Sequence, residues 1–371
     1  MSDERLLETF LQLVQINSPS GFEAACGRYC AEALRALGFD VHFDDSAAST
    51  GSDTGNLVAE LPGTVPGVLA LSAHLDCVEP CRGIRPSVVD GIVSSDGATV
   101  LGADDKAGLA ASIETFRRLI ESSEPRPTLK ALFTVQEELG LVGAKELAPG
   151  DVSCDLCLVL DAEGQPGGIV TAAPTHYTFA AEFRGRASHA GVAPENGTSA
   201  ILMATNAIGR MRLGRLDESS TANVGTIKGG TATNVVAARC DVTGECRSRS
   251  RARVEEIRAE MHAAMVAAAE EAGGKLDIVW KLEYEGFLYA EDHPLVRLVS
   301  DACRDAGVEP SMFATGGGSD ANVLAGMGVP ALALACGMQG VHGTNERIAV
   351  KDLEALTDIC LAVARRMAER G

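Results

Sequence analysis

Basic residues are scarce in this 371-residue sequence, which has 32 lysines and arginines against 51 aspartates and glutamates. The formal net charge is therefore −19. Proteins that bind nucleic acids or anionic membranes need basic patches that attract phosphate groups. The charge balance argues against both partners, and it is compatible with a site for cations.

Long apolar runs are also missing. No uninterrupted stretch reaches the roughly 18 residues of a membrane-spanning helix, so we expect no membrane partner. The first five residues are mostly charged or polar and lead into an amphipathic helix pattern, not into the apolar segment of a secretory signal. We therefore expect a cytoplasmic protein.

The cysteines follow no disulfide framework. Their number, 11, is odd and they are spread over the whole chain, which fits free or buried thiols in a reducing compartment. Two close pairs, Cys77 with Cys81 and Cys154 with Cys157, have the spacing of half a zinc knuckle. Neither has a matching second pair, so we interpret all four as small buried apolar residues.

The order of the predicted elements indicates two domains, which the length also favours, since single cores stop growing at about 250–300 residues. Apolar strands alternate with helices in residues 1–173 and again in residues 288–371, which is typical of an α/β fold. Residues 174–287 follow the order β-α-β-β-α-β of a ferredoxin-like unit. We predict a discontinuous α/β domain interrupted by an inserted ferredoxin-like domain.

Several strands of the α/β domain are predicted to end in histidine or acidic residues. Apolar strands are expected over residues 68–73, 129–136 and 156–160. The first runs into His74, the second into the neighbouring acids Glu137 and Glu138, and the third into Asp161. In α/β proteins, ligands gather at the carboxyl ends of the strands.

Taken singly, these residues have simpler interpretations. His74 could be a hydrogen-bonded core histidine, and Glu137-Glu138 a solvated strand end. Asp104-Asp105, in a turn bounded by glycines, could cap the helix predicted to follow it. Asp161 could be a turn residue.

Taken together, five of the residues form a metal-ligand set: His74, Asp104, Glu138, Asp161 and His342. Two histidines and three carboxylates suit a pair of divalent ions, zinc first, then manganese or cobalt. The carboxylates would offset most of the +4 charge. Glu137 is then left beside the ions, where it could serve as a base.

With these motifs in order, the chain resembles the co-catalytic zinc exopeptidases, a family that includes peptidase T, carboxypeptidase G, aminoacylase and succinyl-diaminopimelate desuccinylase. The peptidase T branch is the most similar, and the resemblance covers nearly the whole chain. The stretches that carry it are residues 72–76, 101–108, 136–140, 187–195, 229–234 and 317–322.

The resemblance implies a role for each metal ligand. Asp104 would bridge both ions. His74 and Asp161 would complete one site, and Glu138 and His342 would complete the other. The choice of Asp104 over its neighbour as the bridge rests on the resemblance, because spacing alone cannot make it.

The resemblance also implies roles around the ions. Asp76 would hold His74, and Glu137 would be the general base. His189, on the inserted domain, would stabilise the developing oxyanion. Asn234 and Arg247 would hold a substrate carboxylate or backbone. The inserted domain would be a lid and would form a homodimer.

These expectations predict a two-metal hydrolase that cleaves amide bonds of short peptides, most simply a tripeptide-type aminopeptidase. The same machinery could instead remove an N-acyl group from an amino acid, or a C-terminal residue. A metal- or peptide-binding relative without activity is a further alternative. One departure from the family pattern is Gly343, which follows His342 where close relatives would have threonine or serine.

Overall fold

The computed structural model describes residues 2–370, which divide into two compact units. Unit 2 contains Ala172–Leu288 and Thr315–Gly318, and unit 1 contains the rest of the described chain. Unit 2 is therefore inserted into unit 1. The short segment Thr315–Gly318 clusters with unit 2, although its sequence position had placed it in the α/β domain.

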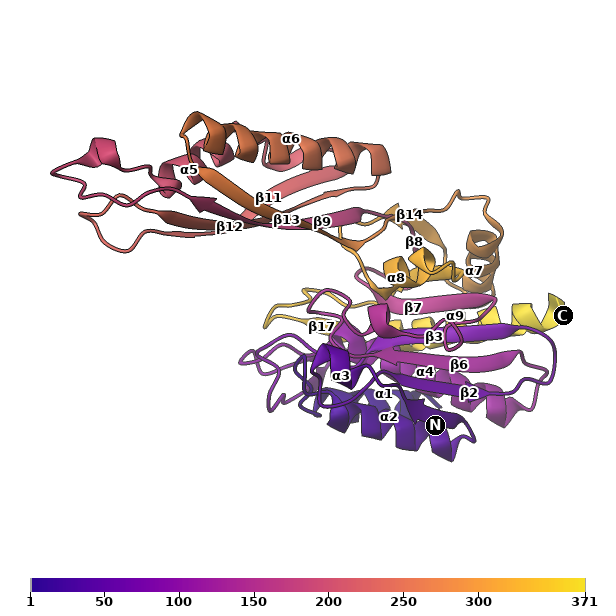
Figure 1. The fold of residues 1–371 in the computed structure, drawn as a ribbon. Helices are drawn as coiled ribbons and strands as arrows, with labels where there is room; N and C mark the ends of the chain where they lie inside the picture. The colour runs from indigo at the N-terminus through magenta and orange to yellow at the C-terminus, as the bar shows by residue number, and fades with distance from the viewer. Residues whose placement is uncertain (1, 371) are drawn as a thin grey trace. The chain divides into compact units, whose positions relative to one another are not determined.

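The sheet of unit 1 has a parallel centre and antiparallel edges (Figure 1). In the order β1-β2-β6-β3-β7-β16-β8, the central strands β6, β3, β7 and β16 are parallel neighbours, and β15 pairs with β8. Nearly every residue of β3 and β6 is buried, as expected for strands covered on both faces. The strands are β1 (Asp40–Phe43), β2 (Leu57–Leu61), β3 (Val68–His74), β6 (Thr128–Thr134), β7 (Leu156–Ala162), β8 (Gly168–Ala173), β15 (Ser311–Ala314) and β16 (Ala331–Ala335).

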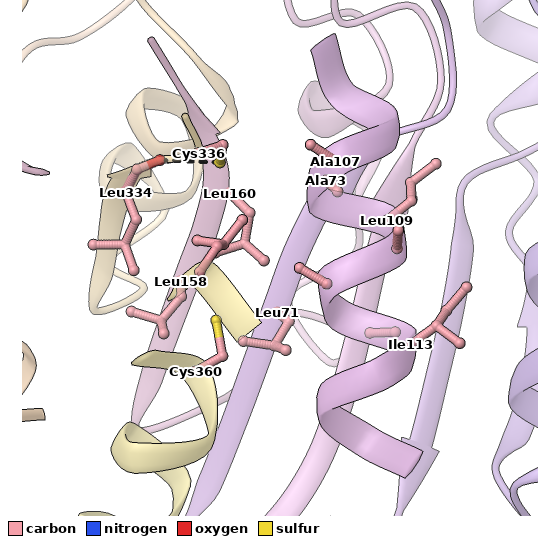
Figure 2. Close-up of a cluster of buried hydrophobic side chains, with 14 of the residues drawn as sticks. Leu71, Ala73, Ala107, Leu109, Ile113, Leu158, Leu160, Leu334, Cys336 and Cys360 are labelled. Carbon is pink, nitrogen blue, oxygen red and sulfur yellow. Dashed lines mark hydrogen bonds between the residues drawn. The ribbon is translucent and has the colours of Figure 1, made fainter. Parts of the chain in front are cut away.

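Helix α4 (Ala103–Ser122) packs against β3 and β7, with α1 (Ser2–Val14) and α9 (Val350–Arg370) beside it. Figure 2 shows side chains of α4, β3 and β7 in one buried cluster, to which α9 adds Cys360. The approach of α4 to the sheet is close, because a Cβ on Gly108 would lie 2.6 Å from the carbonyl oxygen of Leu160. This packing fixes the first turn of α4 beside the ends of β3 and β7.

The remaining elements of unit 1 surround this core. A separate small sheet has the order β17-β5-β4. Among residues 2–370, no helix combines the length and the apolar character that a membrane crossing requires. The further elements are α2 (Ala24–Ala36), α3 (Ala47–Thr50), β4 (Ser87–Val89), β5 (Ile92–Ser94), η1 (Ala144–Glu146), α7 (Pro294–Asp305), α8 (Asp320–Gly326) and β17 (Arg347–Ala349).

Unit 2 has an antiparallel sheet in the order β10-β11-β12-β9-β13, with α5 and α6 packed against it (Figure 1). Its chain order is that of the predicted β-α-β-β-α-β unit with the short edge strand β10 added. The two helices bury the apolar alternate residues of β9, among them Phe179 and Phe183. The elements are β9 (Thr175–Arg184), η2 (Pro194–Asn196), α5 (Ala200–Arg210), β10 (Gly214–Asp217), β11 (Ser220–Gly229), β12 (Arg239–Ser248), α6 (Arg251–Glu271), β13 (Lys275–Tyr284) and β14 (Phe287–Leu288).

One predicted strand of unit 2 starts later than expected. The sequence placed a strand over residues 234–246, whereas β12 begins at Arg239. The backbone before it pairs elsewhere, because the N–H of Val236 donates to the carbonyl of Ser188 at 3.0 Å. Asn234 consequently lies in a loop.

Candidate metal centre

The predicted ligands come from the carboxyl ends of neighbouring parallel strands. β3 ends at His74, and Asp161 is the last residue but one of β7. Glu138 follows β6 and His342 follows β16, while Asp104 lies in the first turn of α4. Because parallel strands present their carboxyl ends at one edge of a sheet, these side chains meet there.

The segment with the two glutamates is a turn, and the predicted strand over residues 129–136 was too long. β6 ends at Thr134, and Gln136 adopts a left-handed backbone conformation with φ 50°. The N–H of Val135 donates to the side-chain oxygen of Asn56 at 3.0 Å instead of extending the strand. The turn directs the chain across the end of the sheet just before Glu137.

The first cluster consists of His74, Asp104 and Asp161, each of which offers one ligand atom within 4.8 Å of the others. The Nε2 atom of His74 lies 2.9 Å from Asp104 Oδ1 and 3.8 Å from Asp161 Oδ1. The side chain of His74 is 1% exposed, and those of the two aspartates are 12% and 11% exposed. This cluster is almost closed to solvent.

The second cluster consists of Asp104, Glu138 and His342, again with ligand atoms within 4.8 Å of one another. The Nε2 atom of His342 lies 3.2 Å from Asp104 Oδ2 and 3.0 Å from Glu138 Oε2. Asp104 thus presents one carboxylate oxygen to each histidine. This is the geometry that a bridging ligand requires.

Asp105, in contrast, is turned toward the backbone. Its side chain is buried, and its oxygens accept hydrogen bonds from the N–H groups of His74, at 3.1 Å, and of Gly108, at 3.0 Å. The peptide bond between Asp104 and Asp105 is cis. The two neighbouring acids therefore have separate partners, and only Asp104 faces both histidines.

Asp76 joins the first cluster to the turn with the glutamates. Its carboxylate lies 3.2 Å from His74 Nδ1 and accepts the N–H groups of Glu137, at 3.0 Å, and Glu138, at 3.3 Å. The hydroxyl of Ser20 donates to it at 2.6 Å. A carboxylate behind a histidine fixes the orientation of the ring, and here it also fixes the two residues that follow β6.

Hydrogen bonds and electrostatic attraction between the histidines and the acids shift their pKa values. Burial works to lower the pKa of His74, but hydrogen bonds to Asp104 and Asp76 raise it well above the usual value. Hydrogen bonds to Asp104 and Glu138 raise the pKa of His342 to about 10. Burial works to raise the pKa of Asp104, which the two histidines nevertheless hold below its usual range. These shifts reflect the short distances between the imidazole nitrogens and the carboxylate oxygens.

The remaining acids of the two clusters, Asp161 and Glu138, lie close to other carboxylates and have few positively charged neighbours. Burial, followed by the charges of Glu137 and Asp104, raises the pKa of Asp161 well above its usual value. The Oε1 atom of Glu138 is buried and has no hydrogen-bond partner among the described residues. Divalent cations in place of the protons would neutralise this charge and use the free oxygen, so the donor set fits two such ions.

Glu137 belongs to neither cluster, although it is next to Glu138 in the chain. It is buried, with 9% of its surface exposed, and burial raises its pKa well above the usual value. The charges of Asp320 and Glu138 raise the pKa further. Its position leaves a carboxylate beside the clusters that is available to carry a proton.

Sequence reasoning missed several buried residues that hold the site. The carboxylate of Glu23 accepts the N–H groups of Gly21, at 2.7 Å, and Gln136, at 3.1 Å. The Nζ atom of Lys106 donates to the carbonyls of Leu75, at 2.6 Å, and Asp76, at 3.1 Å. Lys106 stands inside the Asp104–Gly108 motif and could have been singled out there. The bond from Glu23 to Gln136 spans 113 residues, so no local pattern indicates its role at the site.

Two of the predicted substrate residues, His189 and Asn234, are exposed on loops of unit 2. The Nδ1 atom of His189 accepts the N–H of Gly191 at 3.2 Å. The carbonyl of Asn234 accepts the N–H of Ala190 at 2.9 Å, which ties the two loops together. Neither residue belongs to the clusters of unit 1.

Arg247, the third predicted substrate residue, is half-buried on β12. Its guanidinium donates to Glu245, at 2.8 Å, and to the hydroxyl of Tyr284, at 3.3 Å. The Nε atom is buried without a hydrogen-bond partner among the described residues. This donor is unused in the described chain and is closed to solvent.

The loop of His342 has a backbone conformation that restricts its neighbours. His342 itself is left-handed, with φ 63°. A Cβ on Gly343 would lie 2.6 Å from the side-chain oxygen of Asn345, which is too close for contact. A threonine or serine at position 343 would therefore require the amide of Asn345, at the end of a flexible side chain, to shift.

Known proteins resemble the chain along its full length. Residues 70–366 match peptidase family M20/M25/M40. The aminopeptidase PepT of Bacillus cereus is 42% identical, with a TM-score of 0.91 and 99% of each chain covered. A tripeptidase of Staphylococcus aureus is 36% identical, with a TM-score of 0.94, covering 100% of this chain and 99% of its own. The Bacillus subtilis protein YqjE is 39% identical over 370 residues, which is 100% of both chains.

These similarities confirm the resemblance and the mixed α/β fold with an inserted domain that were predicted from the sequence. The family match covers most of the chain and includes every residue of the two clusters. The full-length structural matches also include unit 2. The chain belongs to peptidase family M20/M25/M40 and is a metallopeptidase-type hydrolase of that family.

Proposed function

We propose that this peptidase is a two-metal aminopeptidase that acts on short peptides, tripeptides above all. One observation carries the proposal: two clusters share Asp104, and the carboxylate of Glu137 stands beside them without belonging to either. The names of the similar proteins from Bacillus cereus and Staphylococcus aureus, an aminopeptidase and a tripeptidase, support this substrate class.

His74, Asp104 and Asp161 would hold one ion, and Asp104, Glu138 and His342 the other. Imidazole and carboxylate ligands suit zinc, with manganese or cobalt as substitutes. Bound ions would acidify a water molecule and polarise the scissile carbonyl. Asp76 would keep the His74 ring in place, because it accepts the proton on Nδ1 and leaves Nε2 to face the ion.

Glu137 would move the proton. It would accept one from the attacking water and deliver it to the amine that leaves, so that water and peptide become a carboxylic acid and an amine; the acid then gives its proton to the amine or to solvent. Burial raises the pKa of its carboxyl, and two nearby cations would oppose that rise. A carboxyl group with opposed influences of this kind is suited to accepting and then releasing a proton.

Residues of unit 2 would complete substrate binding. His189 accepts a hydrogen bond on Nδ1, so its neutral form carries the proton on Nε2 and can donate to a developing oxyanion. Arg247, whose side chain is 26% exposed, would hold a substrate carboxylate or carbonyl. Asn234 would provide a further amide to the substrate backbone.

A cytoplasmic homodimer formed through unit 2 is part of the same proposal. The cysteines are free, as a reducing compartment would keep them. Unit 2 exposes large apolar side chains, among them Leu202 at 62% and Val279 at 69%, that a partner copy could cover. Analytical ultracentrifugation of the metal-loaded protein would determine the oligomeric state.

Three tripeptides of one sequence test the substrate class: unblocked, N-acetylated and C-amidated. An aminopeptidase needs the free amino group, so we expect hydrolysis of the unblocked peptide and loss of hydrolysis on acetylation. Cleavage of N-acyl amino acids alone would establish an amidohydrolase, and release of the C-terminal residue a carboxypeptidase. If the protein binds ions but hydrolyses none of these substrates, the remaining interpretation is a metal- or peptide-binding relative without activity.

A further inference from the structure

A buried carboxylate next to the second cluster has no role in the chemistry described above. Glu346 is 1% exposed and lies four residues after His342. Among the described residues it forms no ion pair with a lysine or arginine within 4.0 Å. Burying an ionised carboxylate is costly unless other groups stabilise the charge, so its hydrogen bonds must do this.

Those hydrogen bonds all come from the backbone around Asp104. Glu346 Oε2 accepts the N–H groups of Leu101, at 2.8 Å, and Gly102, at 2.7 Å. Its Oε1 accepts the N–H of Asp104 itself, at 3.0 Å. Charge-assisted bonds of this kind are stronger than neutral ones, and the N–H groups at the start of a helix otherwise lack partners. One side chain thus fixes the turn that leads into α4.

The other end of this link is the loop of His342. Gln339 and Arg347 exchange two backbone hydrogen bonds of 3.0 Å, which close the loop between them. Inside it, the N–H of Glu346 donates to the carbonyl of Gly343 at 3.0 Å. His342 and Glu346 therefore belong to one closed loop, and the carboxylate of Glu346 fastens that loop to the backbone of Asp104.

We propose that Glu346 is a positioning residue that sets the distance between Asp104 and His342, and thereby the affinity of the second cluster for its ion. The inference rests on the proposed two-metal function. Glu346 does not touch the ion. It acts through two ligands that are far apart in the sequence. The first cluster shares Asp104 but takes His74 and Asp161 from the sheet, so it should depend on Glu346 less than the second cluster, which also needs the loop of His342.

The experiment is a titration of metal-free protein with Zn²⁺ in the presence of a competing chelator, which resolves the two dissociation constants. Glu346→Gln keeps the shape but offers one acceptor oxygen and places an amide against backbone donors. We expect the weaker constant to rise about 10–100-fold, the usual effect of removing a group that orients a ligand. The tighter constant should change less than about threefold.

Glu114→Gln is the matched control. Glu114 is also a buried carboxylate of unit 1, but its partners are Arg5, Arg117 and Arg118. We expect a lower melting temperature and unchanged metal constants. Glu346→Asp retains the carboxylate on a side chain that is one methylene shorter. We expect a smaller rise in the dissociation constant of the weaker site and no change at the tighter site. This variant also tests the inference if Glu346→Gln does not fold.

Equal constants for wild type and both Glu346 variants would overturn the inference, and so would an equal loss of both sites. Wild-type protein that binds fewer than two ions would overturn the proposed function and the inference with it. If every variant binds two ions tightly, the inference about Glu346 is overturned and the proposed function stands. Co²⁺ spectra of the variants, which report the ligand geometry at each site, provide the second readout.

Discussion

The two candidate metal clusters share a ligand but differ in how the rest of each cluster is built. In the first, His74 ends a central strand and its side chain is 1% exposed. In the second, His342 lies on a loop in a left-handed conformation, and its side chain is 55% exposed. A preorganised site loses less conformational freedom when it binds, so we expect the first cluster to bind its ion more tightly.

The comparison also shows where each cluster obtains its rigidity. Asp76 holds the ring of His74 directly, at 3.2 Å. The loop of His342 is instead held through its backbone by Glu346. We therefore expect one ion to remain through purification and the other to exchange.

Replacing the shared ligand should have the largest effect. In Asp104→Asn, both clusters lose a negatively charged ligand, so neither ion should remain after dialysis. We expect kcat/KM for the tripeptide to fall about 10⁴-fold, because metal ions supply several kcal/mol of transition-state stabilisation and each ~1.4 kcal/mol is a factor of ten. Metal analysis and hydrolysis assays test this, with Asp277→Asn on the surface of unit 2 as the control. If Asp104→Asn retains two ions, Asp104 is not the bridging ligand.

Glu137→Gln should separate binding from chemistry. The change keeps the volume of the side chain and both clusters, so two ions should remain. Loss of the proton acceptor should lower kcat by about 10²–10⁴-fold. Glu138→Gln is the matched control, since the neighbouring residue belongs to the second cluster and its change should release one ion. The opposite pattern of metal content would exchange the two assignments.

Removing the exposed histidine, His342, should impair metal binding at the second cluster only. In His342→Ala, we expect the weaker dissociation constant to rise at least about 100-fold, more than for an orienting residue, while the tighter one is retained. His74→Ala should instead raise the dissociation constant of the tighter site. Chelator titrations measured side by side compare them directly. If His74→Ala released only the weaker ion, the order of affinities proposed here would be reversed.

The smallest effect on stability is that of pH on the metal-free protein, and metal binding should depend on pH with the opposite sign. In the metal-free protein the pKa of His342 is raised to about 10 from an ordinary value of 6.5. The folded state then binds the proton more tightly, so this contribution to stability is full below pH 6.5 and is lost as the pH rises through about 10. Thermal melts of metal-free wild type and His342→Ala between pH 7 and 10 should converge.

Metal binding should show the reverse dependence. An ion must displace the protons on His74 and His342, so its apparent affinity should fall about tenfold per pH unit for each proton displaced as the pH is lowered. Calorimetry in buffers of different protonation enthalpy counts those protons. Binding without proton release would mean that the histidines are not ligands.

Much of this arrangement could be predicted from the sequence. The apolar strands ending at His74 and Asp161 and the glycine-bounded turn at Asp104 indicate an α/β fold with ligands at one edge of its sheet. The family match and the full-length structural matches confirm that fold. The roles of the individual ligands stay predictions.

What escaped prediction depends on contacts between distant segments. Glu346 bonds to N–H groups more than 240 residues away, and a backbone donor has no sequence signature. Asn234 was assigned to the strand predicted over residues 234–246, but hydrogen bonds to the loop of Ser188 keep this segment out of β12. The turn after Thr134 was hidden by Val135, whose N–H pairs with the side chain of Asn56.

The order of the ligands along the chain has a consequence for protein synthesis. The first cluster can be assembled once residue 161 has been made, whereas the second needs His342, which follows the whole of unit 2. A nascent or truncated chain that ends before this loop has no complete pair of clusters. The growing polypeptide therefore lacks the second candidate cluster until nearly all of it has been translated.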